Sequence, residues 1–469
     1  MRYGVGILVF ILIGAVSCGG GGGGGTGSGG PPGPVDPPAG STRVTVVARD
    51  AFGSPVPGAS ITLLESKGTG ILELNMVTDA HGRAEVVGGF EDVYAAMLTA
   101  TDLFGISYEP RQPADDQIEF DVTLHPSSGL TPGIGRVTVT GGSADGRRLE
   151  FSARLYVVEG SASEGQDLEA WNIDAVGVLP CAADCVAGPA GFDAAYQGST
   201  LNQDWVDPEP LPAPLALALL LDQGMSVALT DPMDRRLLAA RYLQTRLGPD
   251  DQVALAAFAA DDAGTGQAAS LPEQPVTLFP TDNPGFTPDG RAYFPVIDSL
   301  ATLSGGSSPL HAALAELIDF TATAAPPGNR GTVVALASSD VSDCGSPADC
   351  RAAQDALRAQ SGAADVPVVV AGLSGPSAQA DRRRLGPFAQ FENGAVFWVQ
   401  DARQVPTLFG RMPEIVAGRH GTVDVTIRLE SPVTGAFAPG NMVVGTLQVV
   451  ICPWDCTELL DVPFGLHIP

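Results

Sequence analysis

Apolar residues form a repeating pattern of long runs and helical stretches between residues 212 and 418. The runs occupy residues 215–221, 253–259, 332–337, 366–373 and 395–399. Continuous apolar runs are typical of strands that are covered on both faces, and their alternation with helices predicts an open parallel sheet. Leu310, Leu314, Leu317 and Ile318 have the spacing of a helix with one apolar face. Residues 234–247 form a second helix candidate.

On both sides of this region, apolar and polar residues alternate with the period of half-buried strands. Residues 41–126 contain strand-like segments at 43–48, 55–64 and 78–86 with a turn at 50–53, which predicts a small β-sandwich. Residues 134–205 contain strands at 136–140 and 149–158 within otherwise irregular sequence. Residues 420–469 return to alternation. These last strands could pair with those before residue 212, so that the parallel-sheet domain is inserted in a sandwich or flanked by one.

The first 40 residues have the composition of an export signal and a tether. Arg2 precedes an apolar core at 5–16, which is shorter than the apolar stretch that a transmembrane helix needs. The residues Ala-Val-Ser-Cys that end at Cys18 resemble a bacterial lipobox, which implies a signal peptide over 1–18, cleavage before Cys18 and lipidation of its thiol. Gly19 stands where Asp retains lipoproteins at the inner membrane, which favours the outer membrane. An ordinary signal peptide with a chance Cys is the alternative. Residues 19–40 are rich in Gly and Pro and should hold the folded part away from the membrane.

The net charge limits the classes of binding partner, and the cysteine content indicates the cellular compartment. The net charge of −28 argues against nucleic acid and anionic membrane surfaces, so we expect membrane contact only through the lipid anchor. Six further cysteines fall in three close pairs, and an exported chain with an even number suggests local disulfides. Metal binding by these thiolates is the rival interpretation, but no His lies near a pair. The pairs are Cys181/Cys185, Cys344/Cys350 and Cys452/Cys456.

Several ordered segments of residues 212–418 resemble the von Willebrand factor type A (VWA) family. The apolar run at 215–221 ends in Asp-Gln-Gly-Met-Ser (222–226), where the family has Asp-x-Ser-x-Ser. Further pieces are GGSSPLHAAL (305–314), TVVALASSDVSDC (332–344) and FENGAVFWVQ (391–400). The resemblance implies a VWA-type, Rossmann-like open parallel sheet with helices on both faces. The whole chain is then a multidomain α/β plus all-β protein, with β-sandwich elements flanking the sheet.

Residues 41–126 have a resemblance of their own. DAFGSPVPGA (50–59) followed by TDAHG (78–82) is similar to carboxypeptidase regulatory-like and bacterial Ig-like modules, which implies a spacer or a binding surface. Asp50 and Asp79 could suggest calcium. A role in turns is favoured, because Asp side chains hydrogen-bond to their own backbone there.

The VWA resemblance also implies a candidate metal site at the strand ends. Family members hold Mg²⁺ or Mn²⁺ through two Asp, two Ser and one Thr, and an acidic group of the ligand completes the shell. Asp222 and Ser226 match, Ser308 stands at the Thr position and keeps a hydroxyl, and Gly224 does not match. Ser338 stands at the last Asp position, with Asp340 two residues on. Asp222, Ser226 and Ser308 are therefore the candidate metal ligands, with reduced affinity. A helix-capping role is the alternative for Ser308, which precedes Pro309, and for Asp222.

No catalytic constellation accompanies this site. The five His are scattered, and no nucleophile elbow, phosphate loop or zinc motif is present. We expect a non-catalytic, lipid-anchored protein of the cell envelope that binds a protein ligand, as in adhesion, on the strand-end face of its VWA domain. A metal-independent structural or assembly scaffold is the alternative, and an enzyme would need a site hidden in residues 134–210.

Overall fold

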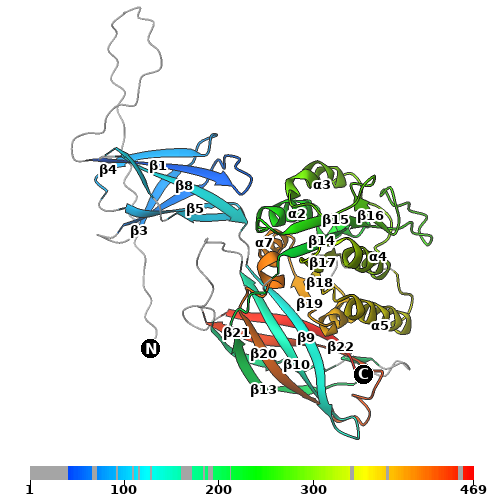
Figure 1. Cartoon of the computed structure of the whole chain (residues 1–469). Coiled ribbons are helices and arrows are strands. Elements are labelled where there is room, and N and C mark those ends of the chain that lie inside the picture. Colours follow the sequence, from blue (N-terminus) through cyan, green and yellow to red (C-terminus); the bar gives the residue numbers. More distant parts are fainter. Residues whose placement is uncertain are drawn as a thin grey trace, which may run out of the picture.

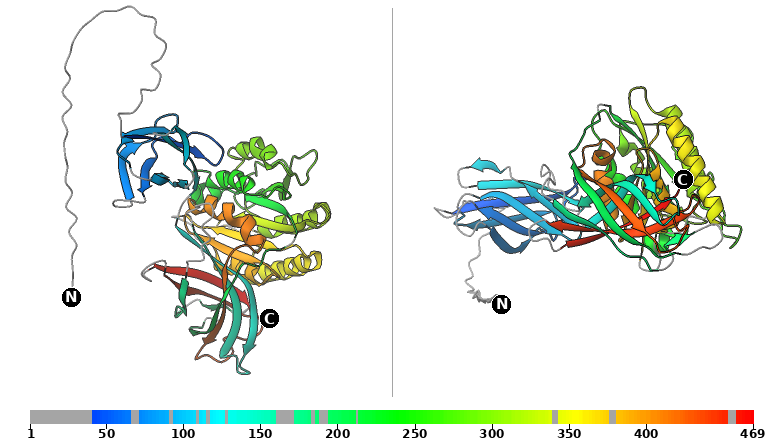
Figure 2. Two further views of the ribbon diagram at one scale, coloured as in Figure 1. Left: turned by 60° about the vertical axis from the view of Figure 1, so that its left-hand side comes forward. Right: turned by 90° about the horizontal axis from the view of Figure 1, so that it is seen from below.

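The computed structural model of the chain describes most of residues 41–469 (Figure 1). The described ranges are 41–65, 71–90, 93–107, 110–114, 117–126, 129–159, 172–182, 185–187, 194–211, 213–338, 343–375, 380–452 and 458–469. The predicted signal peptide with Cys18, the predicted tether, Asp340 and Cys456 lie outside these ranges. A small β unit projects from one end of a larger body (Figure 2).

The small β unit contains eight strands around one apolar core. Val46, Leu63 and Phe120 are among its fully buried side chains. Asp50 and Asp79 close turns as expected: Asp50 Oδ1 accepts from the amides of Phe52 and Ser54, and Asp79 Oδ1 from those of His81 and Arg83. The sheet order is β3-β2-β5-β6-β8-β1-β4, with β7 on β8. The strands are β1 (Thr42–Asp50), β2 (Ser60–Glu65), β3 (Ile71–Val77), β4 (Arg83–Gly88), β5 (Val93–Ala100), β6 (Leu103–Ser107), β7 (Arg111–Ala114) and β8 (Gln117–Pro126).

The larger body is built on a parallel sheet, as the apolar runs predict. Its strands are β14 (Leu215–Asp222), β15 (Gln252–Phe258), β16 (Val276–Phe279), β17 (Arg330–Ala337), β18 (Val368–Leu373) and β19 (Ala395–Val399). The order is β16-β15-β14-β17-β18-β19, and all pairs are parallel except β15–β16. Alternate residues of β14 enter two different cores, which explains why its whole run is apolar.

Helices cover both faces of this sheet, so the predicted α/β class is confirmed. α4 (Leu310–Ala324) and α5 (Pro347–Ala364) pack on one face. α2 (Arg235–Thr245), α3 (Phe294–Leu300) and α7 (Gln404–Val416) pack on the other. The remaining short helices are α1 (Val227–Thr230), η1 (Gly290–Tyr293), α6 (Arg382–Leu385) and η2 (Gly386–Gln390).

Antiparallel strands from both ends of the body continue the parallel sheet (Figure 1). β9 (Leu130–Gly142) pairs with β19, and beyond it come β10 (Arg148–Glu159), β20 (Thr422–Glu430) and β13 (Gln197–Val206). A second sheet, of β11 (Asn172–Val178), β12 (Val186–Ala187), β21 (Met442–Cys452) and β22 (Glu458–His467), shares a core with them. The strands before residue 212 and after residue 420 therefore pair with one another in two sheets, and only the sheet of β9, β10, β20 and β13 is continuous with the α/β sheet.

Two of the three expected disulfides are present. Cys181–Cys185 and Cys344–Cys350 are bonded, with Cα–Cα distances of 5.9 and 5.0 Å. The third pair cannot be placed, because Cys456 falls outside the described ranges. Within those ranges, no helix combines the length and apolar character that crossing a membrane requires.

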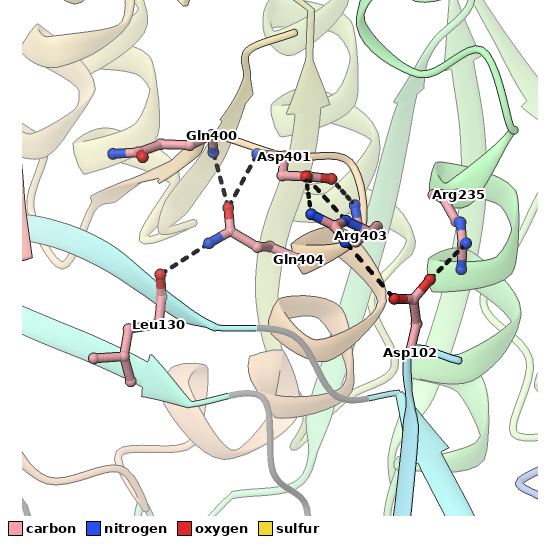
Figure 3. Close-up of polar contacts among 7 residues, drawn as sticks. All are labelled: Asp102, Leu130, Arg235, Gln400, Asp401, Arg403 and Gln404. Atoms are coloured by element: carbon pink, nitrogen blue, oxygen red, sulfur yellow. Dashed lines mark hydrogen bonds and ion pairs between the residues drawn. The ribbon is translucent and has the colours of Figure 1, made fainter. Parts of the chain in front are cut away.

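The small β unit is fixed to the larger body by polar and aromatic contacts. Asp102, in the turn between β5 and β6, forms ion pairs with Arg235 (2.9 Å) and Arg403 (4.0 Å), at the starts of α2 and α7 (Figure 3). The Arg241 guanidinium lies 5.0 Å from the ring centroid of Phe52 and 4.6 Å from that of Phe294. These contacts orient the unit on the α2–α7 side of the sheet.

Candidate functional site

The carboxylate of Asp222 is the centre of the candidate site, at the carboxyl end of β14. Ser308 and Ser338 reach it from the segment before α4 and from the end of β17, because neighbouring parallel strands end at the same edge of the sheet. Asp222 Oδ1 accepts from the Gly224 amide and the Ser308 hydroxyl, both at 2.8 Å. Asp222 Oδ2 accepts from the Ser338 amide at 2.8 Å and its hydroxyl at 2.5 Å.

Ser226 joins this network through Ser338. The two Oγ atoms are 2.5 Å apart. Because the Ser338 proton is directed at Asp222, Ser226 is the donor in this pair. The predicted grouping of Asp222, Ser226 and Ser308 is thus observed, with Ser338 in the position where the family has Asp. The capping alternative for Ser308 is wrong: Pro309 occupies the N-cap position of α4, and the Ser308 hydroxyl is bonded to Asp222.

Gly224 permits the close approach of these side chains. A Cβ atom at position 224 would lie 2.1 Å from Ser308 Oγ and 3.1 Å from Asp222 Oδ1. Both distances are shorter than ordinary van der Waals contact. The absence of a side chain at position 224 is therefore coupled to the direct Ser308–Asp222 hydrogen bond.

Burial dominates the electrostatics of the site. Asp222, Ser308 and Ser338 are each 1% exposed. Burial raises the pKa of the Asp222 carboxyl, and its hydrogen bonds from Ser338, Gly224 and Ser308 oppose that shift. The carboxylate is stabilised by four protein donors, which is enough to satisfy both oxygens.

These residues do not fit Mg²⁺ well. Mg²⁺ takes six hard oxygen ligands in near-octahedral geometry at 2.0–2.1 Å. The site offers one carboxylate and three hydroxyls, Gly224 contributes no side-chain ligand, and the hydroxyl protons of Ser308 and Ser338 point at the carboxylate. The described residues also contain no group of three His, Cys, Asp or Glu side chains able to hold a metal. Coordination would require breaking the existing hydrogen bonds.

A buried arginine fixes the loop that follows Asp222, and the sequence pattern did not identify it. Arg236 is 1% exposed and donates to Asp231 Oδ2 (3.2 Å) and Gln223 Oε1 (3.1 Å). Asp231 in turn accepts from the amides of Arg235 and Arg236 at the start of α2. Only the Asp-Pro before an Arg-containing helix hinted at this ion pair.

His311 occupies a buried position in α4 beside the site. Its Nδ1 lies 2.7 Å from Asp343 Oδ1, and its ring stacks on Phe388. Asp343 also accepts from the Ala312 amide and neighbours the Cys344–Cys350 disulfide. These contacts give His311 a structural role in joining α4 to the segment after β17.

The loop over the site exposes large apolar side chains. Met225 is 47% exposed, Leu229 59% and Met233 74%, within nine residues of one another. Leu229 lies in α1, and Met225 precedes the N-cap of that helix by one residue. We call these three residues the methionine patch.

The chain matches no known family model and no curated protein. Among solved structures, a von Willebrand factor type A protein from Catenulispora acidiphila gives a TM-score of 0.34 at 9% identity, covering 72% of this chain and 74% of that one. The conserved hypothetical protein BatB from Bacteroides thetaiotaomicron gives 0.23 at 16% identity, covering 42% and 87%. The VWA domain of SpRpn10 gives 0.31 at 12% identity, covering 43% and 96%. Similarities this low carry no argument about the site.

Proposed function

We propose that this chain is a non-catalytic protein-binding module of the cell envelope. Its parallel-sheet domain is a VWA-type domain whose metal site is degenerate, and it binds a protein ligand on the strand-end face without a metal ion. The observation that carries this proposal is the methionine patch, whose exposed apolar side chains stand in the segment that follows a carboxylate which the protein itself satisfies.

The patch has the character of a binding surface. Apolar side chains grouped on the surface favour an interaction site, and methionine adapts its shape to partners because it is unbranched and polarizable. The hydrogen bonds of Asp222 and the Arg236–Asp231 ion pair fix the segment that carries the methionine patch. Little conformational entropy is therefore lost when a partner binds. Lipidation at Cys18 and the tether over 19–40 would hold the folded part away from the outer membrane.

Titration of Mg²⁺ and Mn²⁺ into the full chain by calorimetry tests the metal-independent part of the proposal. We expect no saturable heat from either ion, because each would have to displace hydrogen bonds at Asp222. The Asp222→Ala variant is the control. Saturable binding that this variant loses would show instead that the site holds a metal.

Photo-crosslinking tests the face itself. We expect a photoreactive amino acid at position 229 to capture a discrete envelope protein, with unchanged yield in EDTA. The Met225→Gln, Met233→Gln double variant should lose the product. Val77→Gln, which changes an apolar residue 54% exposed on the small β unit, should retain it. Equal capture by the double variant would rule out the methionine patch as the binding surface.

A further inference from the structure

A cavity of about 100 Å³ lies at the end of the parallel sheet opposite Asp222. Arg330 and Ala395, at the starts of β17 and β19, form its floor. Strands β9, β10 and β20 and the end of α7 supply its walls. The cavity exists because antiparallel strands continue the parallel sheet, so a bare VWA-type sheet would not enclose it.

Three arginines line this cavity, and among the described residues two of them form no salt bridge. Arg154 is neutralised by Asp424 through two hydrogen bonds of 2.7 and 2.8 Å. Arg136 and Arg330 form no salt bridge with any carboxylate in the described part of the chain; the Arg330 guanidinium donates to the Val416 carbonyl, at 3.4 Å. Burial lowers the pKa of the Arg330 guanidinium, the Asp365 charge raises it, and the charge of Arg136 lowers it further. Two like charges are thus held near one another.

Arg136 occupies a backbone conformation that favours glycine. Its φ is 50°, and it lies in a β-bulge, since Thr138 pairs with Ser152 and Gly135 with Arg154 while Ala153 faces two residues. Bulges redirect side chains and are frequent beside functional sites. A left-handed conformation is unfavourable for Arg, and such strain also concentrates at ligand sites. Asn393, with a φ of 55°, lines the same cavity.

A buried hydroxyl completes the set of donors. Thr332 lines the cavity, is 1% exposed, and its Oγ1 has no hydrogen-bond partner among the described residues. A buried polar atom without a partner is unfavourable unless a bound molecule satisfies it. Asp207 and Glu209 also line the cavity, where they oppose a second negative charge on a ligand.

We propose that this cavity binds a small monocarboxylate, held by Arg136 and Arg330 with the Thr332 hydroxyl as a further donor. Planar guanidinium groups match a carboxylate through paired hydrogen bonds. The ligand is a simple carboxylic acid or an amino acid; in an amino acid, Asp207 and Glu209 would receive the ammonium group. Both ligand classes present a carboxylate, and titration with acetate and glycine distinguishes them.

Titration of acetate, glycine and inorganic phosphate into the full chain by calorimetry tests this proposal. We expect saturable binding of acetate or glycine that is stronger than that of phosphate. Tighter binding of glycine would assign the amino acid, and tighter binding of acetate the simple acid. Stronger binding of phosphate, or no binding of any probe, would overturn the proposal.

The variants separate binding from folding. Arg136→Gly and Arg330→Met should each lower the affinity for the preferred carboxylate at least about tenfold, because each removes a charge-assisted hydrogen bond. Arg136→Gly should not lower Tm, because glycine adopts this φ readily. Arg428→Met is the matched control: it removes an arginine of β20 that pairs with Glu150 outside the cavity, and binding should be unchanged. If Arg136→Gly bound the carboxylate with wild-type affinity, Arg136 would have a structural role alone.

Discussion

At the scale of single residues, Gly224 decides the state of the candidate metal site. The Asp222 carboxylate receives four hydrogen bonds, one of them from Ser308, and there is no room for a side chain at position 224 while that bond exists. Glycine at position 224 thus goes together with closure of the site by the Ser308–Asp222 hydrogen bond. The side chain of a serine at position 224 would clash with Ser308 and Asp222 and push them apart.

The Gly224→Ser variant tests this coupling. We expect it to lower the free energy of unfolding by about 1–3 kcal/mol, the usual cost of overpacking a buried position. In a Ser308→Ala background the same change should cost less, because the atom that a Cβ meets at 2.1 Å is removed. Urea denaturation of the four proteins in this double-mutant cycle measures the coupling. Strictly additive effects would show that the two positions do not interact.

At the scale of elements, β22 is fixed to α5 and η2 by one histidine. The His467 amide donates to Gln390 Oε1 (2.7 Å), and His467 Nε2 lies 2.7 Å from Gln354 Oε1. Since an amide oxygen only accepts, Nε2 carries the proton, which leaves Nδ1 deprotonated. Burial lowers the pKa of His467 to about 4.

This shift makes the docking of β22 sensitive to acid. The unfolded chain binds a proton at His467 near its ordinary pKa of 6.5 and the folded chain only near 4, so stability is present above pH 6.5 and is lost as the pH falls towards 4. The loss is up to about 3 kcal/mol. His467→Gln should remove this part of the pH dependence in urea denaturation between pH 7 and 4. Burial also lowers the pKa of His420, whose contribution should remain.

The exposed His81 supplies the control for this prediction. His81→Gln should follow the wild-type profile. Asp222 acts in the opposite sense: burial raises its pKa, so its ionisation reduces stability as the pH rises above the ordinary Asp range. That contribution is common to all three proteins and cancels in their differences. An unchanged profile in His467→Gln would contradict the role of His467.

At the scale of the whole molecule, two folded units act as one because arginines of the larger body meet the small β unit. Arg235 pairs with Asp102, and the Arg241 guanidinium contacts the ring of Phe52, which also packs edge-to-face on Phe294. Tyr242 Oη also lies 2.9 Å from His125 Nδ1 in a buried contact. In a chain of net charge −28, these cations offset repulsion between the units.

Removal of these cations should loosen the molecule without unfolding either unit. We expect the Arg235→Ala, Arg241→Ala double variant to lose about 1–3 kcal/mol of interface energy, because one ion pair (Arg235–Asp102) and one cation–π contact (Arg241–Phe52) across the interface are removed. Small-angle scattering should then report a larger radius of gyration. Arg428→Ala, on β20 and paired with Glu150, is the control. An unchanged radius would mean that other contacts orient the small β unit.

The sequence by itself determined the features that depend on neighbours along the chain. Apolar runs located the parallel strands, helical spacing located α4, and close cysteine pairs located two disulfides. The candidate grouping of Asp222, Ser226 and Ser308 was implied by the resemblance to the VWA family, in which parallel strands bring their carboxyl ends to one edge. The local period of apolar residues fixes which face of a helix or strand is buried, so these strands and this helix could be predicted without knowledge of tertiary contacts.

Only the tertiary structure decided which distant segments meet. Alternation in residues 423–429 predicted a strand, but its place between β13 and β10 depends on pairing across more than 200 residues, which no local period encodes. The same holds for the closed state of Asp222, the burial of Arg236, the exposure of Met225 and the cavity around Arg136. Each depends on how close two elements approach, and packing of the whole chain sets that distance.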